Sequence, residues 1–330
     1  MKKLKIVILH NQLSKEAKTD EADVMQQVQL VYNCLNELGH SVSIFPLSLN
    51  LEVGRDNLIA MQPDLVFNLV ESFDNKGELV YLAPALLDAL AMPYTGTHTV
   101  PMFQSASKTL TKENLIKAAL LTPLSFELHE TELFEAGKTY ILKPRWEEGS
   151  LDLDEDAVFS GDNLEFIAGL KKLPKQAWFV EEFIDGREFN CAIIAKSSGP
   201  EVLAVAEIEF IDFPKGKPRM LGYKAKWDED SFEYNNTVRK LDFAEADAVL
   251  IEKLRILGLQ CWDACSLGGY ARVDFRVDRH GNPFILEVNS NPCISPDSGY
   301  YAAAIHAGYD FTDIVEWIVA DAINQFKIIN

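Results

Sequence analysis

Four polar residues near the C-terminal end of the chain have the types and the spacing of a phosphate-handling metal site. Arg272 and Asp274 are separated by one apolar residue, and so are Glu287 and Asn289. Because side chains alternate between the two faces of a β-strand, each pair is expected on one face. Mg²⁺ prefers oxygen ligands such as carboxylates and amides, and a guanidinium stabilises negative charge that develops beside the metal. The four residues therefore predict a site that binds Mg²⁺ and phosphate.

The two segments that carry these residues are expected to pair as one β-hairpin. Residues 278–282 have the composition of a tight turn. Closure of the turn at residues 280–281 sets the two carboxylates opposite each other and the guanidinium opposite the amide. The alternative is a hairpin with an ordinary solvated face, but the polar loop that follows Asn289 and contains Ser298 favours a site. The expected apolar faces are Val273, Phe275 and Val277 on the first strand and Phe284, Leu286 and Val288 on the second.

Composition excludes several classes of partner. The chain has 330 residues, of which 48% are hydrophobic and 25% charged, as in a globular protein with two or three structural units. Its net charge of −19 argues against nucleic acid and against an anionic membrane, because both are bound by basic patches. The sequence shows neither a charged leader with an apolar centre nor an apolar run near ~18 residues. We expect a cytoplasmic protein that acts on small molecules.

The five cysteines predict reduced thiols. Their number is odd, and they are scattered through segments that are expected to be buried. Cys261 and Cys265 are close in sequence, but neither a second pair nor a suitably spaced histidine joins them as metal ligands. We interpret the cysteines as structural.

The first part of the chain alternates strands and helices, which is typical of a small parallel α/β unit. Residues 212–236, rich in polar residues and without periodicity, are expected to form a long mobile loop. The expected strands are 5–9, 42–45, 64–68, 140–143, 178–182, 188–195 and 202–210. The expected helices are 21–38, 79–90, 108–121, 163–171, 243–258 and 310–326.

Two further segments have features of a nucleotide site. Lys143 ends an apolar strand and is followed by a short loop that contains Gly149, a plausible phosphate cradle. The alternative is a lysine that extends along the surface into solvent. Residues 178–188 form an apolar strand that ends in acids and a turn, which offers backbone groups to an adenine edge and a carboxylate to a ribose.

In their order, these segments resemble the ATP-grasp enzymes, and specifically the D-alanine:D-alanine ligase branch. That family's pattern runs Arg-x-Asp, then Glu-x-Asn-x-x-Pro, then Ser, and the similarity spans nearly the whole chain, including residues 64–68 and 93–96. The resemblance implies an α/β (α+β) ATP-grasp fold. It implies an N-terminal Rossmann-like domain over 1–96, a central subdomain over 97–182 and a C-terminal subdomain over 183–330, with ATP held between the last two.

The resemblance also implies roles for individual residues. Arg272 faces the transferred phosphoryl group, Ser150 lies in the loop that covers the phosphates, and Lys226 lies in the mobile loop. The expected ligands of Mg²⁺, with Mn²⁺ as an alternative ion, are Asp274, Glu287 and Asn289. The expected ATP contacts are Lys108 and Lys143 at the phosphates, Glu181 and Ile184 at the adenine, and Glu188 at the ribose.

The departures from the family pattern lie in the segments that are expected to bind the amino-acid substrates. The family's glycine-rich element after the first strand is absent, and its His-Gly-x-x-Gly-Glu-Asp-Gly element is replaced by residues 71–78. Trp227 replaces the tyrosine of an Ala-Lys-Tyr sequence, and Asp297 replaces the histidine before Ser298, the residue expected at the substrate carboxylate. Asp23 stands where the family keeps a glutamate for the substrate ammonium, although a charge on the helix surface is the alternative.

The sequence thus predicts an enzyme, an ATP-dependent ligase that joins a carboxylate to an amine through an acylphosphate. Its expected substrates are amino acids or other small carboxylates, in a pocket altered from that of the family. One alternative is a genuine D-alanine:D-alanine ligase of cell-wall synthesis. Another is an inactive nucleotide-binding protein on the same scaffold. Assembly as a homodimer stays open.

Overall fold

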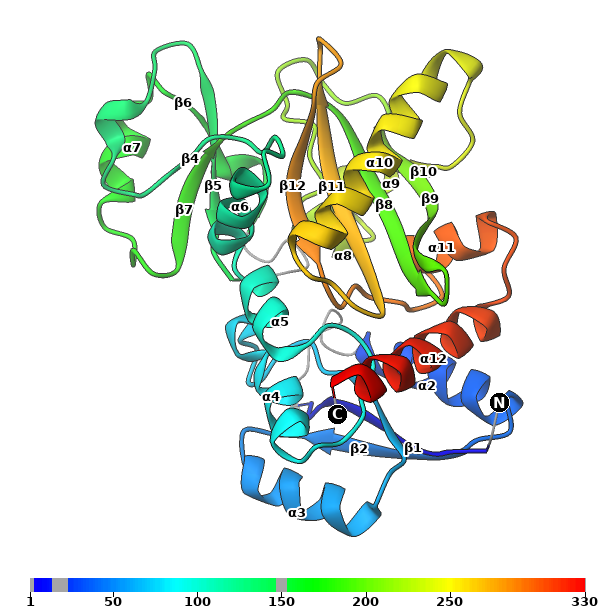
Figure 1. Ribbon diagram of the computed structural model, residues 1–330. Coiled ribbons are helices and arrows are strands. Elements are labelled where there is room, and N and C mark those ends of the chain that lie inside the picture. Colours follow the sequence, from blue (N-terminus) through cyan, green and yellow to red (C-terminus); the bar gives the residue numbers. More distant parts are fainter. Residues whose placement is uncertain (1–2, 14–22, 147–152, 330) are drawn as a thin grey trace.

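A computed structural model describes residues 3–13, 23–146 and 153–329 of the chain. In these residues the chain forms a parallel three-stranded sheet, an antiparallel four-stranded sheet and an antiparallel five-stranded sheet. Figure 1 shows the parallel sheet at the bottom and the other two side by side above it. The mixed helix and sheet composition agrees with the expected fold class.

The N-terminal unit has the strand order β2-β1-β3. Its central strand is buried on both faces, as expected for a parallel sheet that helices cover: Ile6, Val7, Ile8 and Leu9 are 0% exposed. Helix α3 was not expected from the sequence, and its available signal was Asn50, whose side chain accepts a hydrogen bond from the Val53 amide as an N-cap. The elements are β1 (Lys5–Asn11), α2 (Val24–Glu37), β2 (Ser41–Leu47), α3 (Leu51–Met61) and β3 (Leu65–Leu69).

A helical segment leads from this unit to the central sheet, which has the order β4-β7-β5-β6. Helix α7 covers one face of that sheet, where Tyr140, Phe159 and Val180 form the core. The connecting elements are η1 (Gly77–Leu79), α4 (Leu82–Ala89), α5 (Thr99–Ala106) and α6 (Lys108–Lys117). The central elements are β4 (Ser125–Phe126), η2 (Thr131–Leu133), β5 (Thr139–Pro144), η3 (Glu155–Ala157), β6 (Val158–Ser160), α7 (Leu164–Leu170) and β7 (Trp178–Glu182).

The five-stranded sheet has the order β10-β9-β8-β11-β12. Helix α10 contacts β8, β9 and β11 on one face, and α11 and α12 contact β8 on the other. The strands are β8 (Gly186–Lys196), β9 (Gly199–Phe210), β10 (Thr237–Lys240), β11 (Tyr270–Asp278) and β12 (Pro283–Asn289). The helices, after the short η4 (Glu245–Asp247), are α10 (Ala248–Ala264), α11 (Gly299–His306) and α12 (Phe311–Ile329).

Two expectations about this part of the chain are wrong. The helix expected over 243–258 continues to Ala264, because Gly258 is a packing residue and not a helix end: a Cβ there would lie 2.8 Å from the Cys191 sulfur. The loop expected over 212–236 contains two short helices, α8 (Tyr223–Trp227) and α9 (Phe232–Asn235). It is tied to the central subdomain by an ion pair between Lys217 and Glu155, at 2.9 Å.

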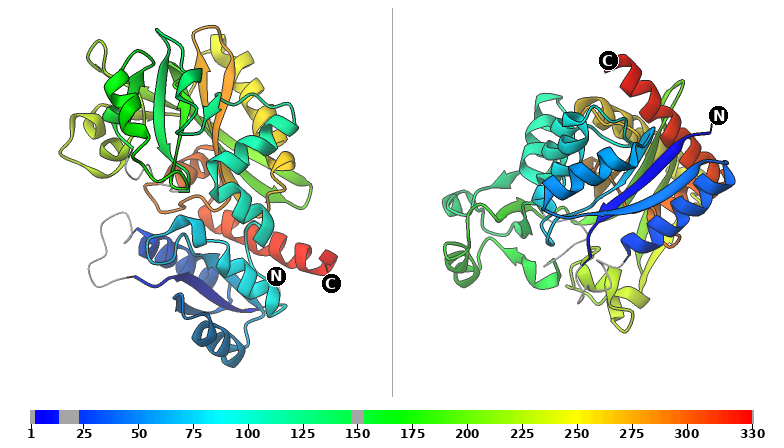
Figure 2. Two further views of the ribbon diagram at one scale, coloured as in Figure 1. Left: turned by 90° about the vertical axis from the view of Figure 1, so that its left-hand side faces the viewer. Right: turned by 90° about the horizontal axis from the view of Figure 1, so that it is seen from below.

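Helix α12 joins the N-terminal unit to the five-stranded sheet. It lies between them (Figure 2), and one hydrophobic core contains Ile8 and Phe67 of the parallel sheet, Ile194 of β8 and Ile318 of α12. The domain boundaries at residues 96/97 and 182/183 remain a prediction. None of the helices in the described residues is both long and apolar enough to span a membrane.

Candidate active site

The β11–β12 hairpin has the register that the sequence predicts at the polar residues. Arg272 pairs with Asn289, and Asp274 pairs with Glu287. The turn differs from the expected one, however, because the amide of Gly281 donates to the Asp278 carbonyl at 3.0 Å and residues 279–281 form a three-residue loop. A bulge after Asp274 compensates for this one-residue difference.

The bulge also changes which apolar residues face the core. Phe275 pairs with Ile285, so Leu286 is the extra residue of β12. Ile285 and Val288 lie in the core, whereas Leu286 lines a pocket. The expectation that Phe284, Leu286 and Val288 share one buried face is therefore wrong, because a bulge interrupts strict alternation.

Two of the predicted residues, with a third from β8, surround the carboxylate of Asp274. Arg272 donates to both of its oxygens, at 2.8 and 2.9 Å, and Asn190 donates to Oδ1 at 2.8 Å. The Asn289 amide nitrogen lies 3.4 Å from Asp274 Oδ2 and 3.5 Å from Glu287 Oε1. The predicted metal ligands thus converge in space.

The surroundings of the Asp274 and Glu287 carboxylates shift their pKa values in opposite directions. Burial and the charge of Glu287 raise the pKa of Asp274, against the opposing effect of Arg272. Burial also opposes the charge of Glu287, but Lys108, 3.8 Å away, and the further cations Lys226 and Lys143 hold the pKa of Glu287 below its usual value. A divalent cation between the carboxylates would relieve their repulsion.

The donor set fits Mg²⁺. It consists of two carboxylates and one amide, and Mg²⁺ commonly takes one or two carboxylates and completes its octahedron with substrate phosphates and water. The part of the chain that the structure describes gathers no group of three or more His, Cys, Asp or Glu side chains that would form a metal site from protein alone.

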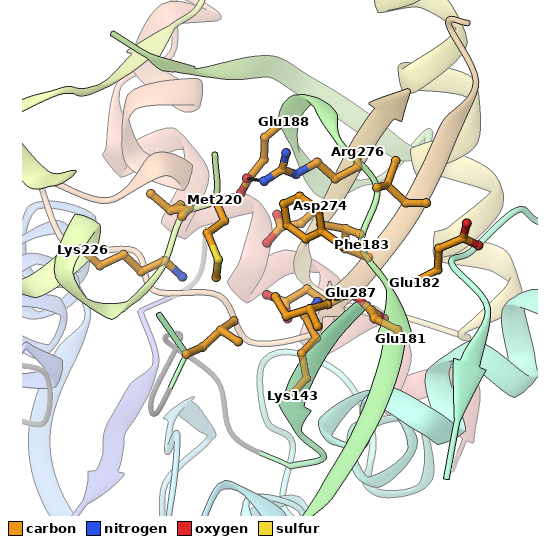
Figure 3. Close-up of a pocket in the computed structure, with 15 residues that line it drawn as sticks. Lys143, Glu181, Glu182, Phe183, Glu188, Met220, Lys226, Asp274, Arg276 and Glu287 are labelled. Atoms are coloured by element: carbon orange, nitrogen blue, oxygen red, sulfur yellow. Dashed lines mark ion pairs between the residues drawn. The ribbon is translucent and has the colours of Figure 1, made fainter. Parts of the chain in front are cut away.

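A pocket that opens to solvent lies between the central sheet and the hairpin, and the empty space in it, open solvent included, is about 600 Å³. Figure 3 shows most of its labelled charged side chains directed inward from both sheets and from α8, whereas Glu182 points outward. An apolar slot beside acids suits a flat aromatic base joined to a hydroxylated sugar. The apolar lining is Ile141, Leu153, Phe183, Ile184, Met220, Leu221 and Leu286. The charged lining is Lys143, Glu181, Glu182, Glu188, Lys226, Asp274, Arg276 and Glu287.

Lys143 is buried at one side of this pocket and not extended into solvent. It is 6% exposed, and its Nζ lies 2.7 Å from Glu181 Oε1. Although burial opposes the charge, the Glu181 carboxylate raises the pKa of Lys143. A second lysine, Lys112, lies 2.8 Å from Glu181 Oε2. Sequence reasoning missed Lys112, although it lies one helical turn after Lys108 on α6.

Arg276 is a second site residue that sequence reasoning missed. It lies 2.9 Å from Glu188 Oε2, donates to the Gly186 carbonyl at 3.0 Å and contacts the Arg219 carbonyl of the segment before α8. Its guanidinium also lies over the ring of Phe183, at 5.5 Å from the centroid. The available signal was its two-residue spacing from Asp274, which places it on the same face of β11.

The segment between β9 and β10 places Lys226 in the pocket. Figure 3 shows its amine directed toward the side where Asp274 and Glu287 lie. Burial and the charge of Arg272 lower the pKa of Lys226, against the attraction of the two carboxylates. Trp227, the last residue of α8, is half-buried. Ser150, expected to cover the phosphates, lies outside the described residues.

Asp23 lies in a second polar cluster and is not among the residues that line the pocket between the central sheet and the hairpin. It is 6% exposed, so the alternative of a helix-surface charge is wrong. The thiol of Cys293, in the loop after β12, donates to Asp23 Oδ2 at 2.9 Å. Burial raises the pKa of Asp23, and the charge of Asp297 contributes in the same direction. The cluster joins residues that lie at opposite ends of the sequence, and Cys293 had no signal as a site residue.

Other members of this cluster come from three segments. Gln27 of α2 donates to Glu71 Oε1 at 2.8 Å, and Ser295 donates to Asp297 Oδ1 at 2.7 Å. Ser298 is the N-cap of α11, where its hydroxyl accepts from the Tyr301 amide at 3.1 Å. The predicted substrate residues Asp23 and Ser298 are thus linked through the loop that follows the β11–β12 hairpin.

Arg239 of β10 brings a positive charge to the same loop. One of its terminal nitrogens lies 3.5 Å from the Asp297 carbonyl oxygen and 3.4 Å from that of Ser298. Sequence reasoning did not single out Arg239, which follows the segment between β9 and β10 and carries no motif of its own.

Comparisons with known proteins place this chain in a family. The model of the family described as D-ala D-ala ligase C-terminus matches residues 158–320. An uncharacterized protein, y4sG of Sinorhizobium fredii, is 30% identical over 274 residues, which cover 81% of this chain and 77% of that protein. A D-alanine–D-alanine ligase of Aquifex aeolicus is 28% identical over 325 residues, which cover 96% of this chain and 100% of that enzyme.

Solved structures agree at the level of the fold. The crystal structure of D-alanine–D-alanine ligase from Bacillus anthracis complexed with ATP superimposes with a TM-score of 0.72 at 20% identity, covering 99% of this chain and 100% of that one. The structure of the ligase from Coxiella burnetii gives a TM-score of 0.71 at 16% identity. The chain belongs to the D-alanine:D-alanine ligase-like family of ATP-grasp enzymes, which are carbon–nitrogen ligases that use ATP.

Proposed function

We propose that this ligase joins a carboxylate to an amine through an acylphosphate and that its substrates differ from the two D-alanines of the named relatives. An oxygen of the donor carboxylate attacks the γ-phosphorus of ATP, and the bond to ADP breaks. The amine nitrogen then attacks the carbonyl carbon, and the bond to phosphate breaks. Both steps develop negative charge, which positioned cations stabilise.

The described residues provide such cations on both sides of the pocket. Lys143 and Lys108 are our candidates for contacts with the ATP phosphates, and Glu181, Ile184 and Glu188 are our candidates for the adenine and ribose. Arg272, held in place by both oxygens of Asp274, would face the transferred phosphoryl group and the carbonyl oxyanion. Lys226 would close over the reaction with the segment between β9 and β10, which shields an acylphosphate from water.

Mg²⁺, or Mn²⁺ in its place, would be held by Asp274, Glu287 and Asn289, where it would neutralise phosphate charge. The residues fit this role because their polar atoms converge. In addition, the carboxylates of Asp274 and Glu287 repel each other when no cation lies between them.

One observation carries the proposal of a changed substrate pocket: the partly buried hydrogen bond from Cys293 to Asp23. This bond ties a thiol to the acid that we expect at the substrate ammonium, and Asp297 adds a second negative charge nearby. Where the family pattern has a histidine, this chain therefore has an anion, with Arg239 beside it. Such a change of charge alters which amino acids the site accepts, because a buried polar group without its partner is costly.

The test is a screen for ADP release. The protein is supplied with saturating ATP and Mg²⁺, and D-alanine alone is compared with single and paired L- and D-amino acids; products are identified by mass spectrometry. We expect little or no ADP with D-alanine and clear release with another pair. Robust formation of D-alanyl-D-alanine would refute the changed pocket and support a genuine D-alanine:D-alanine ligase. Binding of ATP without release for any pair would support an inactive nucleotide-binding protein.

A further inference from the structure

Among the described residues, Lys112 is the least exposed lysine or arginine. Its side chain is 2% exposed, and Lys112 is not among the residues that line the pocket in the described part of the chain. Burial of an ammonium is costly unless every proton is bound by an acceptor. The contacts of its Nζ therefore identify what keeps it there.

Lys112 forms one ion pair and donates two hydrogen bonds inside the protein. Its Nζ lies 2.8 Å from Glu181 Oε2, 2.8 Å from the Thr122 hydroxyl and 3.2 Å from the Pro123 carbonyl. A carboxylate and a carbonyl can only accept, and Thr122 already donates its single hydrogen to the Ile285 carbonyl at 2.8 Å. Thr122 and Pro123 therefore accept from Lys112, and its ion pair with the Glu181 carboxylate opposes the effect of burial, which lowers the pKa of Lys112.

The charge balance at Glu181 follows from this. Glu181 is 2% exposed and has one lysine at each oxygen, Lys143 at 2.7 Å and Lys112 at 2.8 Å. The three groups carry a net charge of about +1 by formal count. Without Lys112, the remaining lysine and the carboxylate would form a closed neutral pair, and the Lys143 charge would be engaged by Glu181.

We propose that Lys112 is a positioning residue that compensates Glu181, so that Lys143 is free to turn its charge to a phosphate of the nucleotide. This inference rests on the proposed ATP site. Lys112 also fixes the site mechanically, because Thr122 and the neighbouring Leu121 both bond to Ile285, which precedes the bulge residue Leu286.

The test compares two probes, ATP and adenosine, by calorimetric titration in Mg²⁺ buffer. Only ATP contacts Lys143 through phosphate, so Lys112→Met should weaken ATP binding by about tenfold, a usual coupling within one ion-pair network, and change adenosine binding much less. Lys117→Met is the matched control, because it removes an exposed lysine from the same helix. If Lys112→Met does not fold, Lys112→Gln keeps a neutral donor there and carries the same expectation.

A second-site variant separates positioning from simple packing. In a Glu181→Gln background there is no charge to compensate, so adding Lys112→Met should leave the ratio of ATP to adenosine affinity unchanged. Equal losses for ATP and adenosine, or no loss for ATP, would overturn the proposal. Lys143→Met serves as the reference variant. If Lys143→Met also keeps the wild-type ratio of ATP to adenosine affinity, the proposed ATP site is wrong. If Lys143→Met lowers this ratio and Lys112→Met does not, only the proposed role of Lys112 is wrong.

Discussion

Asp274 and Glu287 lie directly opposite each other across the β11–β12 ladder because two backbone irregularities cancel. The turn has three residues in its loop, which shifts the register by one, and the bulge at Leu286 shifts it back. The bulge also turns Leu286 toward the pocket. The bulge thus determines both that the two carboxylates face each other and that Leu286 contributes to the apolar lining of the pocket.

Glu287→Gln should lower turnover by at least ~100-fold, as is usual when a metal ligand or its partner is lost. The substitution keeps the shape of the side chain, so we expect a folded protein, with a lower melting temperature because the cations that hold the pKa of Glu287 below its usual value lose their partner. Coupled measurement of ADP release, with the substrates that the screen identifies, checks the first expectation and calorimetry the second. Glu165→Gln, on the exposed surface of α7, is the control. Turnover near that of the wild type would exclude Glu287 from the metal site.

Lys143→Ala should weaken ATP binding far more than Lys138→Ala. Lys143 is buried beside the pocket, whereas Lys138 follows Gly137 in a surface turn and pairs with Glu135 at 2.8 Å. Both variants lose one positive charge, so their comparison removes the effect of net charge. Calorimetric titration with ATP measures both, and equal affinities would remove Lys143 from the site.

Arg276→Lys should weaken ATP binding by about tenfold, because lysine replaces a planar fork of donors with a point charge. The arginine holds Glu188 at 2.9 Å and binds two backbone carbonyls at the same time. Titration with ATP gives the affinity, and Arg279→Lys in the exposed hairpin turn is the control. Unchanged affinity would show that Glu188 does not need this partner.

Asp23→Asn should lower activity and leave stability equal or higher at pH 7. Burial raises the pKa of Asp23 above its value in the unfolded chain, so its ionisation costs folding free energy as pH rises through the folded pKa. Below the unfolded pKa the carboxyl is neutral in both states and this cost is absent. We expect an increase of about tenfold or more in the KM of one amino acid, from loss of a buried charge partner.

The measurements for Asp23→Asn are steady-state kinetics and thermal melts at pH 7 and at acid pH. The gain in melting temperature should shrink as pH falls. A variant with unchanged KM for every substrate that the screen identifies would place Asp23 outside the substrate site.

Gly269→Ala should destabilise the fold more than Gly308→Ala. Both glycines have positive φ, of 69° and 85°, so each substitution carries a backbone cost of about 1–2 kcal/mol. At Gly269 a Cβ would also lie 2.8 Å from the Gly96 Cα, whereas nothing lies within 4 Å at Gly308. The crowding should add about 1–3 kcal/mol. Urea unfolding measures both free energies, and equal losses would show that the Gly96 segment moves aside.

The sequence by itself determined the local pattern of the site. Alternation along residues 272–277 and 287–289, with turn residues between them, predicts a hairpin with its carboxylates opposed, and the structure has that register. The order of the motifs identified the family, which the comparisons confirm. Such features depend on neighbours in sequence, so periodicity and turn chemistry are sufficient to predict them.

Only the tertiary structure decided which distant residues meet. Asp23 and Cys293 are far apart in the chain and become partners because α12 joins the N-terminal unit to the five-stranded sheet. Lys112 lies on helix α6, and the role that we propose for it depends on Glu181 of strand β7. The bulge at Leu286 is a break in periodicity, which a periodic pattern cannot predict. Contacts across the fold are selected by the total burial of apolar surface and by the pairing of buried charges, and neither is a property of a local segment.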